Sequence, residues 1–206
     1  MKRLIKIGLT GGIGTGKSTT MRRWEAAGAV GIDADELAHQ ALAPETPTWR
    51  EVVKTFGEGI LNGDRTVNRR RLGEIVFADE GKRKALNGII HPAVDRMLRE
   101  RVKALEQNGE AEVAVGSIPL LYEVGMEREF DCVVVVGCSE PTQIRRLAGK
   151  GLSEDQARAR IAAQWPLSQK MDRADFVIWN DGNLEALSEQ AGMIWANIKE
   201  SYHAAS

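Results

Sequence analysis

Cysteine is scarce in this chain, and its placement excludes a disulfide framework. The two cysteines, Cys132 and Cys138, lie at the ends of one apolar run. If this run is a strand that rises about 3.3 Å per residue, the two Cα atoms are roughly 20 Å apart. A disulfide requires Cα atoms within about 7 Å, so this pair cannot be bridged. We expect buried, reduced thiols, as is usual in cytosolic proteins.

Long apolar runs and an excess of charge of one sign are also absent. No apolar run approaches the length of a membrane span, and the N-terminal residues show a strand pattern without a signal-peptide pattern. The 28 lysines and arginines balance 29 acidic residues, so neither nucleic acid nor an anionic membrane is expected as a partner. Three histidines without short spacing argue against a zinc site. We expect a cytoplasmic protein and, as the simplest case, a monomer, with an oligomer left open.

Glycine, by contrast, is concentrated in one segment near the N-terminus. Residues 11–18 read Gly-Gly-Ile-Gly-Thr-Gly-Lys-Ser and fit the pattern G-x-x-x-x-G-K-[ST]. Residues 4–9 before them read as a strand, and residues 19–27 after them read as a helix. This context predicts a phosphate-binding loop. Its backbone N–H groups would face a polyphosphate, and the helix N-terminus would add the positive end of its dipole.

Two side chains of this loop have predicted roles. Lys17 would reach the β- and γ-phosphates, and the Ser18 hydroxyl would be a Mg²⁺ ligand. The alternative is a glycine-rich turn that binds nothing, but four glycines in eight residues would then cost backbone entropy without a gain. The dinucleotide-binding pattern does not fit, because Lys17 stands where that pattern needs Gly or Ala.

The apolar runs predict the fold class. Helical patterns separate four runs that read as buried parallel strands and a weaker fifth that ends at Asp33. The five runs are residues 4–9, 113–118, 132–136, 176–179 and, as the weaker one, 29–32. We therefore expect an α/β chain of the P-loop NTPase type, with three α/β/α layers and a five-stranded, mostly parallel sheet. In such sheets ligands bind at the carboxyl ends of the strands.

Two helical insertions are expected on this core. Residues 36–109 read as helices, with a start at Thr46-Pro47, a cap at Asn68 and a break or restart at Pro92. This stretch is most simply a second-substrate region, although a packing appendage is the alternative. Residues 141–169 are basic and include a capping box from Ser153, which is typical of a lid over a nucleotide. Residues 1–35, 110–140 and 170–206 would form the nucleotide-binding core.

Carboxylates follow the predicted second strand. Phosphoryl transfer requires positioning, charge neutralisation and a group that takes the proton of the attacking hydroxyl. Asp33 is well placed to accept that proton or to hold Mg²⁺ through water, and Asp35 could do either less directly. The alternative is that one of them only caps a helix over residues 36–43, and this alternative is stronger for Asp35.

Arginines supply candidate charge for the phosphates. Of Arg145 and Arg146, at most one should face the site, because adjacent helical residues diverge. An arginine there could stabilise the transferring phosphoryl group. Arg65 and residues 69–71 form a basic cluster that either grips a phosphorylated substrate or is solvated surface.

The sequence resembles the dephospho-CoA kinase family nearly from end to end. The loop alone is shared by many enzymes. The combination of Asp-Ala-Asp at residues 33–35, His-Pro at 91–92 and Pro-Leu-Leu-Tyr-Glu at 119–123 is specific. Further matching segments are residues 8–19, 56–57, 68–72, 76–77, 86–90, 143–147, 160–164 and 174–180.

The resemblance implies an activity and a set of site residues. The family phosphorylates the ribose 3′-hydroxyl of dephospho-CoA with ATP and Mg²⁺, giving CoA and ADP in the last step of coenzyme A biosynthesis. It implies Asp33, Lys17 and Arg146 as catalytic residues. The implied ATP contacts are Gly12, Ile13, Gly14, Thr15, Gly16, Lys17, Ser18, Thr19, Arg146 and Lys150. The implied acceptor contacts are Asp33, Asp35, His39, Arg69, Leu72, His91, Pro119, Leu120, Leu121 and Glu123.

Three positions depart from the family pattern. His39 stands where the family often has Arg, so a phosphate contact there is lost or shared with Arg69. Lys150 replaces a lid arginine and keeps the charge without a bidentate grip. Ser117 stands where many members have Asp, so that Ser18, Asp33 and water must hold Mg²⁺.

Two other functions are compatible with a phosphate-binding loop. Another small-molecule kinase of the same fold, acting on a nucleoside, a nucleotide or a sugar acid, is the enzymatic alternative. A GTP-dependent switch would need an Asn-Lys-x-Asp segment, whereas this chain has Asn180-Asp181-Gly182 without the lysine.

Overall fold

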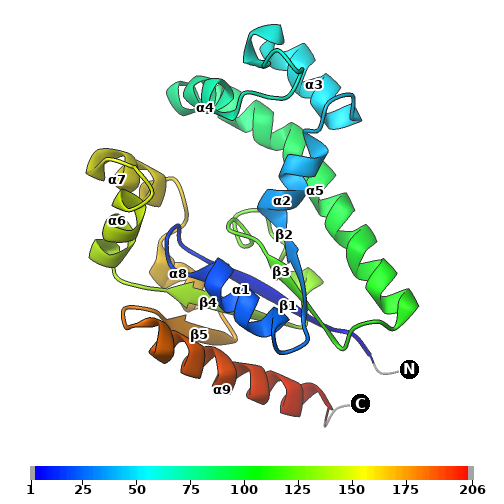
Figure 1. The fold of residues 1–206 in the computed structure, drawn as a ribbon, viewed down its shortest axis with the longest axis vertical. Coiled ribbons are helices and arrows are strands. Elements are labelled where there is room, and N and C mark those ends of the chain that lie inside the picture. The colour runs from blue at the N-terminus through cyan, green and yellow to red at the C-terminus, as the bar shows by residue number, and fades with distance from the viewer. Residues whose placement is uncertain (1–2, 204–206) are drawn as a thin grey trace. The chain divides into compact units, whose positions relative to one another are not determined.

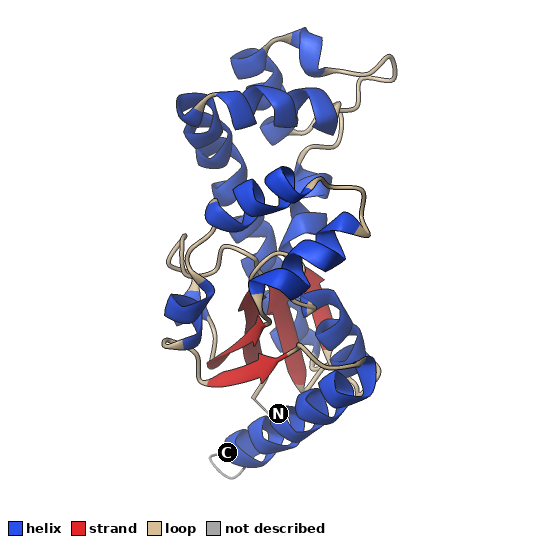
Figure 2. Cartoon of the chain, turned by 90° about the vertical axis from the view of Figure 1, so that its left-hand side faces the viewer, coloured by secondary structure: helices blue, strands red, loops and turns tan. Residues whose placement is uncertain are grey.

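The structure is a computed structural model, and it describes residues 3–203. The chain divides into two compact units: Met1–Ile32 with Ala104–Ser206, here called the core unit, and Asp33–Lys103, the helical unit. Figure 1 shows the course of the chain, and Figure 2 shows the sheet with helices around it. None of the helices within residues 3–203 combines the length and the apolar character that crossing a bilayer requires.

The sheet of five strands confirms the predicted α/β class. Its strands are β1 (Ile5–Gly11), β2 (Val30–Asp33), β3 (Val113–Ser117), β4 (Cys132–Gly137) and β5 (Phe176–Trp179), in the order β2-β3-β1-β4-β5. β1 runs parallel to β3 and β4, with Leu9 opposite Ser117 and Gly11 opposite Val136. β1 is the central strand, so its carboxyl end lies in the middle of the edge that the carboxyl ends of the strands form. Ligands bind at this edge in parallel sheets.

β5 differs from the expectation of a buried strand. Val177 is 40% exposed and Trp179 is 44% exposed. The reason is that β5 is an edge strand, paired to β4 alone. The apolar run therefore predicts the strand correctly but not its place in the sheet.

Three helices of the core unit pack against its sheet: α1 (Lys17–Glu25) on β1 and β3, α8 (Leu167–Met171) on β4 and α9 (Leu184–His203) on β5. The helices α6 (Glu140–Ala148) and α7 (Glu154–Ala162) pack on each other. Trp24 joins α1 to α9: its indole N–H donates to the Ala191 carbonyl at 2.9 Å, and its ring stacks on Trp195 with centroids 6.1 Å apart. The predicted capping box between Ser153 and Gln156 is confirmed at the start of α7.

Two helices of the helical unit, α3 (Pro47–Phe56) and α4 (Arg69–Ala78), begin at the predicted caps. The unit also holds α2 (Ala34–Ala41) and most of α5 (Glu80–Asn108). Thr46 accepts from the Trp49 N–H at the start of α3, and Asn68 accepts from the Arg71 N–H at the start of α4. The unit has its own small core.

The expected break at Pro92 is wrong. α5 runs without interruption through Pro92 over 29 residues. A proline removes one backbone hydrogen bond, here to the carbonyl of Gly88. Both residues are exposed, so water can solvate the released carbonyl and the helix continues.

The two cysteines are free and buried, as expected. Burial, followed by the nearby carboxylates of Asp175 and Asp131, raises the pKa of the Cys132 thiol to about 12. Such a thiol stays protonated at neutral pH and is a poor nucleophile.

Candidate nucleotide and acceptor sites

The phosphate loop joins β1 to α1 through Gly12–Gly16. Gly14 has a φ of 76° and Gly16, the N-cap of α1, has a φ of 112°. A side chain is strained at either angle. At Gly16 a Cβ would also lie 2.3 Å from Nδ2, the side-chain amide nitrogen of Asn180. Two independent reasons, backbone angle and close approach, therefore require glycine at Gly16.

Every carbonyl of the loop from Gly11 to Thr15 accepts a hydrogen bond from a side chain. The Lys17 ammonium donates to the carbonyls of Gly11 at 3.0 Å and Gly12 at 2.8 Å. The remaining donors are Thr15 Oγ1 to Gly12 at 2.9 Å, Gln143 Nε2 to Ile13 at 2.7 Å, Arg146 Nη1 to Gly14 and Thr15 at 3.3 Å each, and Asn180 Nδ2 to Thr15 at 2.7 Å.

This pattern of bonds orients the loop for an anion. In a trans peptide the C=O group and the N–H group of the next residue point in opposite directions. When the surrounding side chains bind the carbonyls, the N–H groups therefore point to the opposite side, into the concave face of the loop. Within residues 3–203, no protein acceptor bonds the N–H groups of Gly14, Thr15, Gly16 or Ser18. Unpaired amides at the N-terminus of a helix form an anion-binding site.

Gln143, Gln164 and Asn180 are site residues that the sequence analysis did not assign. Gln143 is 3% exposed and binds the carbonyl of Ile13, whereas Gln164 accepts from the Ile13 N–H at 2.8 Å. Two polar side chains three residues apart, Gln143 and Arg146, directly after a buried strand were the available signal. They share one helix face, and that face covers the loop.

Arg145 and Arg146 have different environments. Arg146 donates to the loop and, through Nη2, to the Asn180 carbonyl at 2.9 Å, whereas Arg145 is exposed. Lys150, just beyond α6, is exposed. Ser18 is exposed in the first turn of α1, beside the half-buried Thr19.

The segment after β3 is anchored at Pro119. Its carbonyl accepts from Thr10 Oγ1 at 3.3 Å and from the Lys170 ammonium at 2.8 Å. Leu121 is fully buried, and a Cβ on Gly8 would lie 2.8 Å from its Cδ1. Leu121 is thus a core residue, while Leu120 is half-buried.

Glu123, at the end of the same segment, forms an ion pair with Lys170. Its Oε1 lies 2.7 Å from the fully buried Lys170 ammonium and accepts from the Trp165 N–H at 3.0 Å. Glu123 was predicted from the sequence as a site residue, whereas Lys170 was not, because no local pattern predicts a buried lysine.

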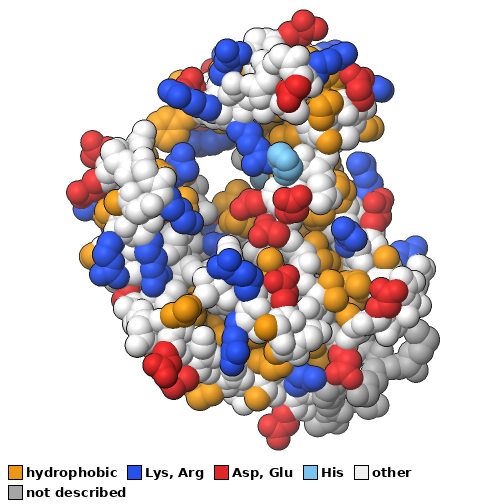
Figure 3. Space-filling model, in the orientation of Figure 1, with side chains coloured by type: hydrophobic (Ala, Val, Ile, Leu, Met, Phe, Trp, Pro, Cys, Tyr) orange, Lys and Arg blue, Asp and Glu red, His pale blue; other side chains and the backbone are white. Residues whose placement is uncertain are grey.

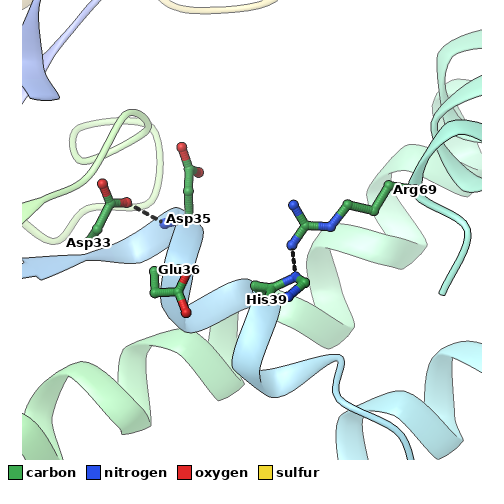
Figure 4. A pocket seen from close by; sticks show the side chains of 5 residues that line it. All are labelled: Asp33, Asp35, Glu36, His39 and Arg69. Atoms are coloured by element: carbon green, nitrogen blue, oxygen red, sulfur yellow. Dashed lines mark hydrogen bonds between the residues drawn. The ribbon is translucent and has the colours of Figure 1, made fainter. Parts of the chain in front are cut away.

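A cavity of about 340 Å³ lies within the helical unit, at the start of α2. Its lining residues are Asp33, Asp35, Glu36, His39 and Arg69, drawn in Figure 4. Figure 3 shows acidic side chains gathered beside a histidine on the face that it draws. The cavity therefore combines three carboxylates with one guanidinium and one imidazole.

Asp33, and not Asp35, is the cap of α2. Asp33 has extended backbone angles, and its Oδ1 accepts from the Asp35 N–H at 2.8 Å. The helix begins at Ala34, earlier than expected, so the capping position falls on Asp33. Only one of its carboxylate oxygens is used in this way, as Figure 4 shows.

His39 and Arg69 contact each other. The Nη2 atom of Arg69 contacts the Nδ1 atom of His39, as Figure 4 shows. Leu72 and His91 are not among the residues that line the cavity. Leu72 is buried against Val52 and Ile60, and His91 is half-buried in α5, where burial lowers its pKa.

Within residues 3–203, no group of three or more His, Cys, Asp or Glu side chains is arranged to hold a metal. Ser117, at the end of β3, is buried and offers no carboxylate. Any cation at the loop would therefore depend on few protein oxygens, among them the exposed hydroxyl of Ser18.

Comparison with known proteins gives consistent results. The profile of a family described as dephospho-CoA kinase matches residues 5–186. A dephospho-CoA kinase of Thermobifida fusca is 41% identical over 201 residues, which cover 97% of this chain and 99% of the relative. A solved protein of Thermus thermophilus is 36% identical with a TM-score of 0.80, over 95% of this chain and 98% of that one. A solved dephospho-CoA kinase from Campylobacter jejuni is 25% identical with a TM-score of 0.71, over 96% and 98% of the two chains.

These matches do not favour a nucleoside, nucleotide or sugar-acid kinase. They extend through the loop, the helical unit and the segment after β3, in which the matching sequence segments lie. The chain belongs to the dephospho-CoA kinase family.

Proposed function

We propose that this protein transfers the γ-phosphoryl group of ATP to the ribose 3′-hydroxyl of dephospho-CoA, giving CoA and ADP in the last step of coenzyme A biosynthesis. The observation that supports the proposal is the phosphate loop: side chains hold its carbonyls, while the amides of Gly14, Thr15, Gly16 and Ser18 remain for a phosphate. Family membership supports the choice of acceptor.

The loop and the side chains around it would bind ATP. The amides of Gly14, Thr15, Gly16 and Ser18 would hold the phosphates, with Gly12, Ile13 and Thr19 beside them. Lys17 would exchange the carbonyls of Gly11 and Gly12 for the β- and γ-phosphates. Arg146 would keep the loop in shape and add positive charge. Lys150 would contact the nucleotide from the lid, residues 141–169.

Mg²⁺ fits the residues present. It keeps several waters and is commonly bound through one or two protein oxygens plus substrate phosphates. The exposed Ser18 hydroxyl offers such an oxygen, and Asp33 could act through water. When bound, Mg²⁺ would neutralise charge on the phosphates.

The acceptor would bind through the helical stretch 36–109 and the segment after β3. Asp33, at the carboxyl end of β2, would accept the proton of the attacking hydroxyl, with Asp35, His39 and Arg69 in the same cavity. Leu72 and Leu121 would shape the acceptor side from buried positions and His91 from a half-buried one, and Pro119, Leu120 and Glu123 would line it. Residues 1–35, 110–140 and 170–206 would form the nucleotide core of a cytoplasmic monomer.

An acceptor panel tests the reaction. With ATP and Mg²⁺, dephospho-CoA should stimulate ADP release at least about a hundredfold over the rate without acceptor, because a positioned hydroxyl replaces water. Adenosine, shikimate and gluconate should not. Absence of stimulation by dephospho-CoA, or a larger effect of another acceptor, would refute the proposal.

Arg146→Lys should weaken the loop. A lysine keeps the charge but cannot reach the carbonyls of Gly14, Thr15 and Asn180 together. We expect kcat/KM for ATP to fall roughly 10- to 100-fold, as for loss of a charge-assisted pair of hydrogen bonds. Arg145→Lys, on the same helix but exposed, is the matched control and should leave kcat/KM unchanged. Equal effects of the two variants would contradict this role.

A further inference from the structure

Lys170 is a fully buried charged side chain of the core unit, and the proposed chemistry gives it no role. It lies in α8 with 0% exposure. Its ammonium donates to the Pro119 carbonyl at 2.8 Å and lies 2.7 Å from Glu123 Oε1. Glu123 is itself only 14% exposed, so this ion pair is shielded from water.

A buried ion pair of this kind contributes little to stability. Removing two charges from water costs about as much as their attraction returns, and apolar replacements are often neutral or stabilising. Glu123 Oε2 is buried without a hydrogen-bond partner within residues 3–203, so the pair is not even fully satisfied. The ion pair instead fixes the relative position of two backbone segments, the one around Pro119 and Glu123 and the one around Lys170.

The pair joins three segments that are distant in sequence. The Pro119 carbonyl also accepts from Thr10, the residue before the last position of β1. Glu123 Oε1 also accepts from the Trp165 N–H at the end of the lid stretch. Lys170 therefore connects the strand that leads into the phosphate loop, the segment after β3 and the lid.

Two cation–π contacts of Arg173 link the same segments. The Arg173 guanidinium lies 5.3 Å from the Trp165 ring and 6.0 Å from the Tyr122 ring. Arg173 follows Lys170 by three residues and lies just beyond the end of α8. The segment after β3 is thus held to the lid by two neighbouring cations.

We infer that Lys170 is a positioning residue for phosphoryl transfer, which orders the segment Pro119–Glu123 beside the end of β1 and links it to the lid at Trp165. This inference rests on the proposed function, in which that segment lines the acceptor. Lys170 touches neither substrate; it acts through the Pro119 carbonyl and the Glu123 carboxylate.

The test separates positioning from stability. Lys170→Met alone leaves a buried carboxylate unpaired and is expected to lower Tm strongly. The double variant Lys170→Met/Glu123→Gln removes both charges and keeps an oxygen for the Trp165 N–H. Its Tm should return to within about 5 °C of the parent value, since replacing both partners of a buried pair is often near neutral.

Kinetics of the double variant give the first readout. We expect KM for dephospho-CoA to rise at least about tenfold, the effect of losing preorganisation of a binding segment, while KM for ATP changes less than about threefold. The matched control is Lys199→Met, whose pair with Glu112 is partly exposed, with Nζ 3.1 Å from Glu112 Oε2. This control should leave both KM values unchanged.

Amide hydrogen exchange gives a readout independent of activity. The N–H groups of Val124, Gly125 and Met126 donate to carbonyls of the same segment. They should exchange at least about tenfold faster in the double variant, while amides of β4 keep their rates, because local opening affects only one segment. Parent rates at these amides together with a parent KM for dephospho-CoA would overturn the inference. If the parent enzyme failed to phosphorylate dephospho-CoA, the proposed function would fall, and exchange would still decide whether Lys170 orders the segment.

Discussion

Asp33→Asn lowers turnover of dephospho-CoA by roughly two to four orders of magnitude, the usual loss when a positioned general base is removed. Asparagine caps a helix as well as aspartate does. The hydrogen bond from the Asp35 N–H can therefore persist, and α2 should keep its start. Affinity for ATP should change little, because the phosphates are assigned to the loop. Steady-state kinetics, equilibrium binding of a non-hydrolysable ATP analogue and thermal unfolding measure the three quantities.

Asp35→Asn is the matched control for this experiment. Asp35 lines the same cavity and carries the same charge, but its side chain does not cap the helix. We expect it to change KM for dephospho-CoA more than kcat. Unchanged turnover in Asp33→Asn, or an equal loss of kcat in both variants, would remove Asp33 from its role as the proton acceptor.

Lys17→Ala should reduce kcat by about two to three orders of magnitude, as when one donor to the developing transition-state charge is lost. In the structure the ammonium bonds the carbonyls of Gly11 and Gly12. Thr15 Oγ1 also bonds the Gly12 carbonyl, and Lys17 is only half-buried, so water can replace the rest. Stability without nucleotide should therefore fall by only about 1–3 kcal/mol, the value of two ordinary hydrogen bonds.

Measurements of kcat, ATP affinity and Tm on the same preparation distinguish the two possible roles of Lys17. Arg22→Ala, an exposed position on the same helix, is the control and should leave all three unchanged. A collapse of Tm in Lys17→Ala without nucleotide would mean that the lysine is chiefly a structural support of the loop.

Local signals predicted the elements with good accuracy. Thr46, Asn68 and Ser153 each cap a helix at the expected position, and Gly57 ends one with a φ of 81°. These features depend on contacts between residues three or four apart, which a sequence displays directly. The same signals erred by a few residues at Asp33, where the helix begins earlier and uses this residue as its cap.

The interactions that hold the loop could not be predicted in the same way. Asn180 lies 165 residues from Thr15, and Gln143 lies 130 residues from Ile13. Whether such side chains meet depends on the strand order, since α6 follows β4 and Asn180 follows β5. The edge position of β5, and with it the exposure of Trp179, depends on the same order.

The amino-acid sequence by itself determined the phosphate loop, the α/β class and the family of this protein, because glycine angles, strand and helix periods and helix caps are properties of neighbouring residues. The tertiary structure alone decided which side chains hold the loop carbonyls and where the Lys170–Glu123 pair lies. Those contacts arise only when the sheet brings distant segments together. A buried lysine is tolerated only where folding has already placed a carboxylate beside it.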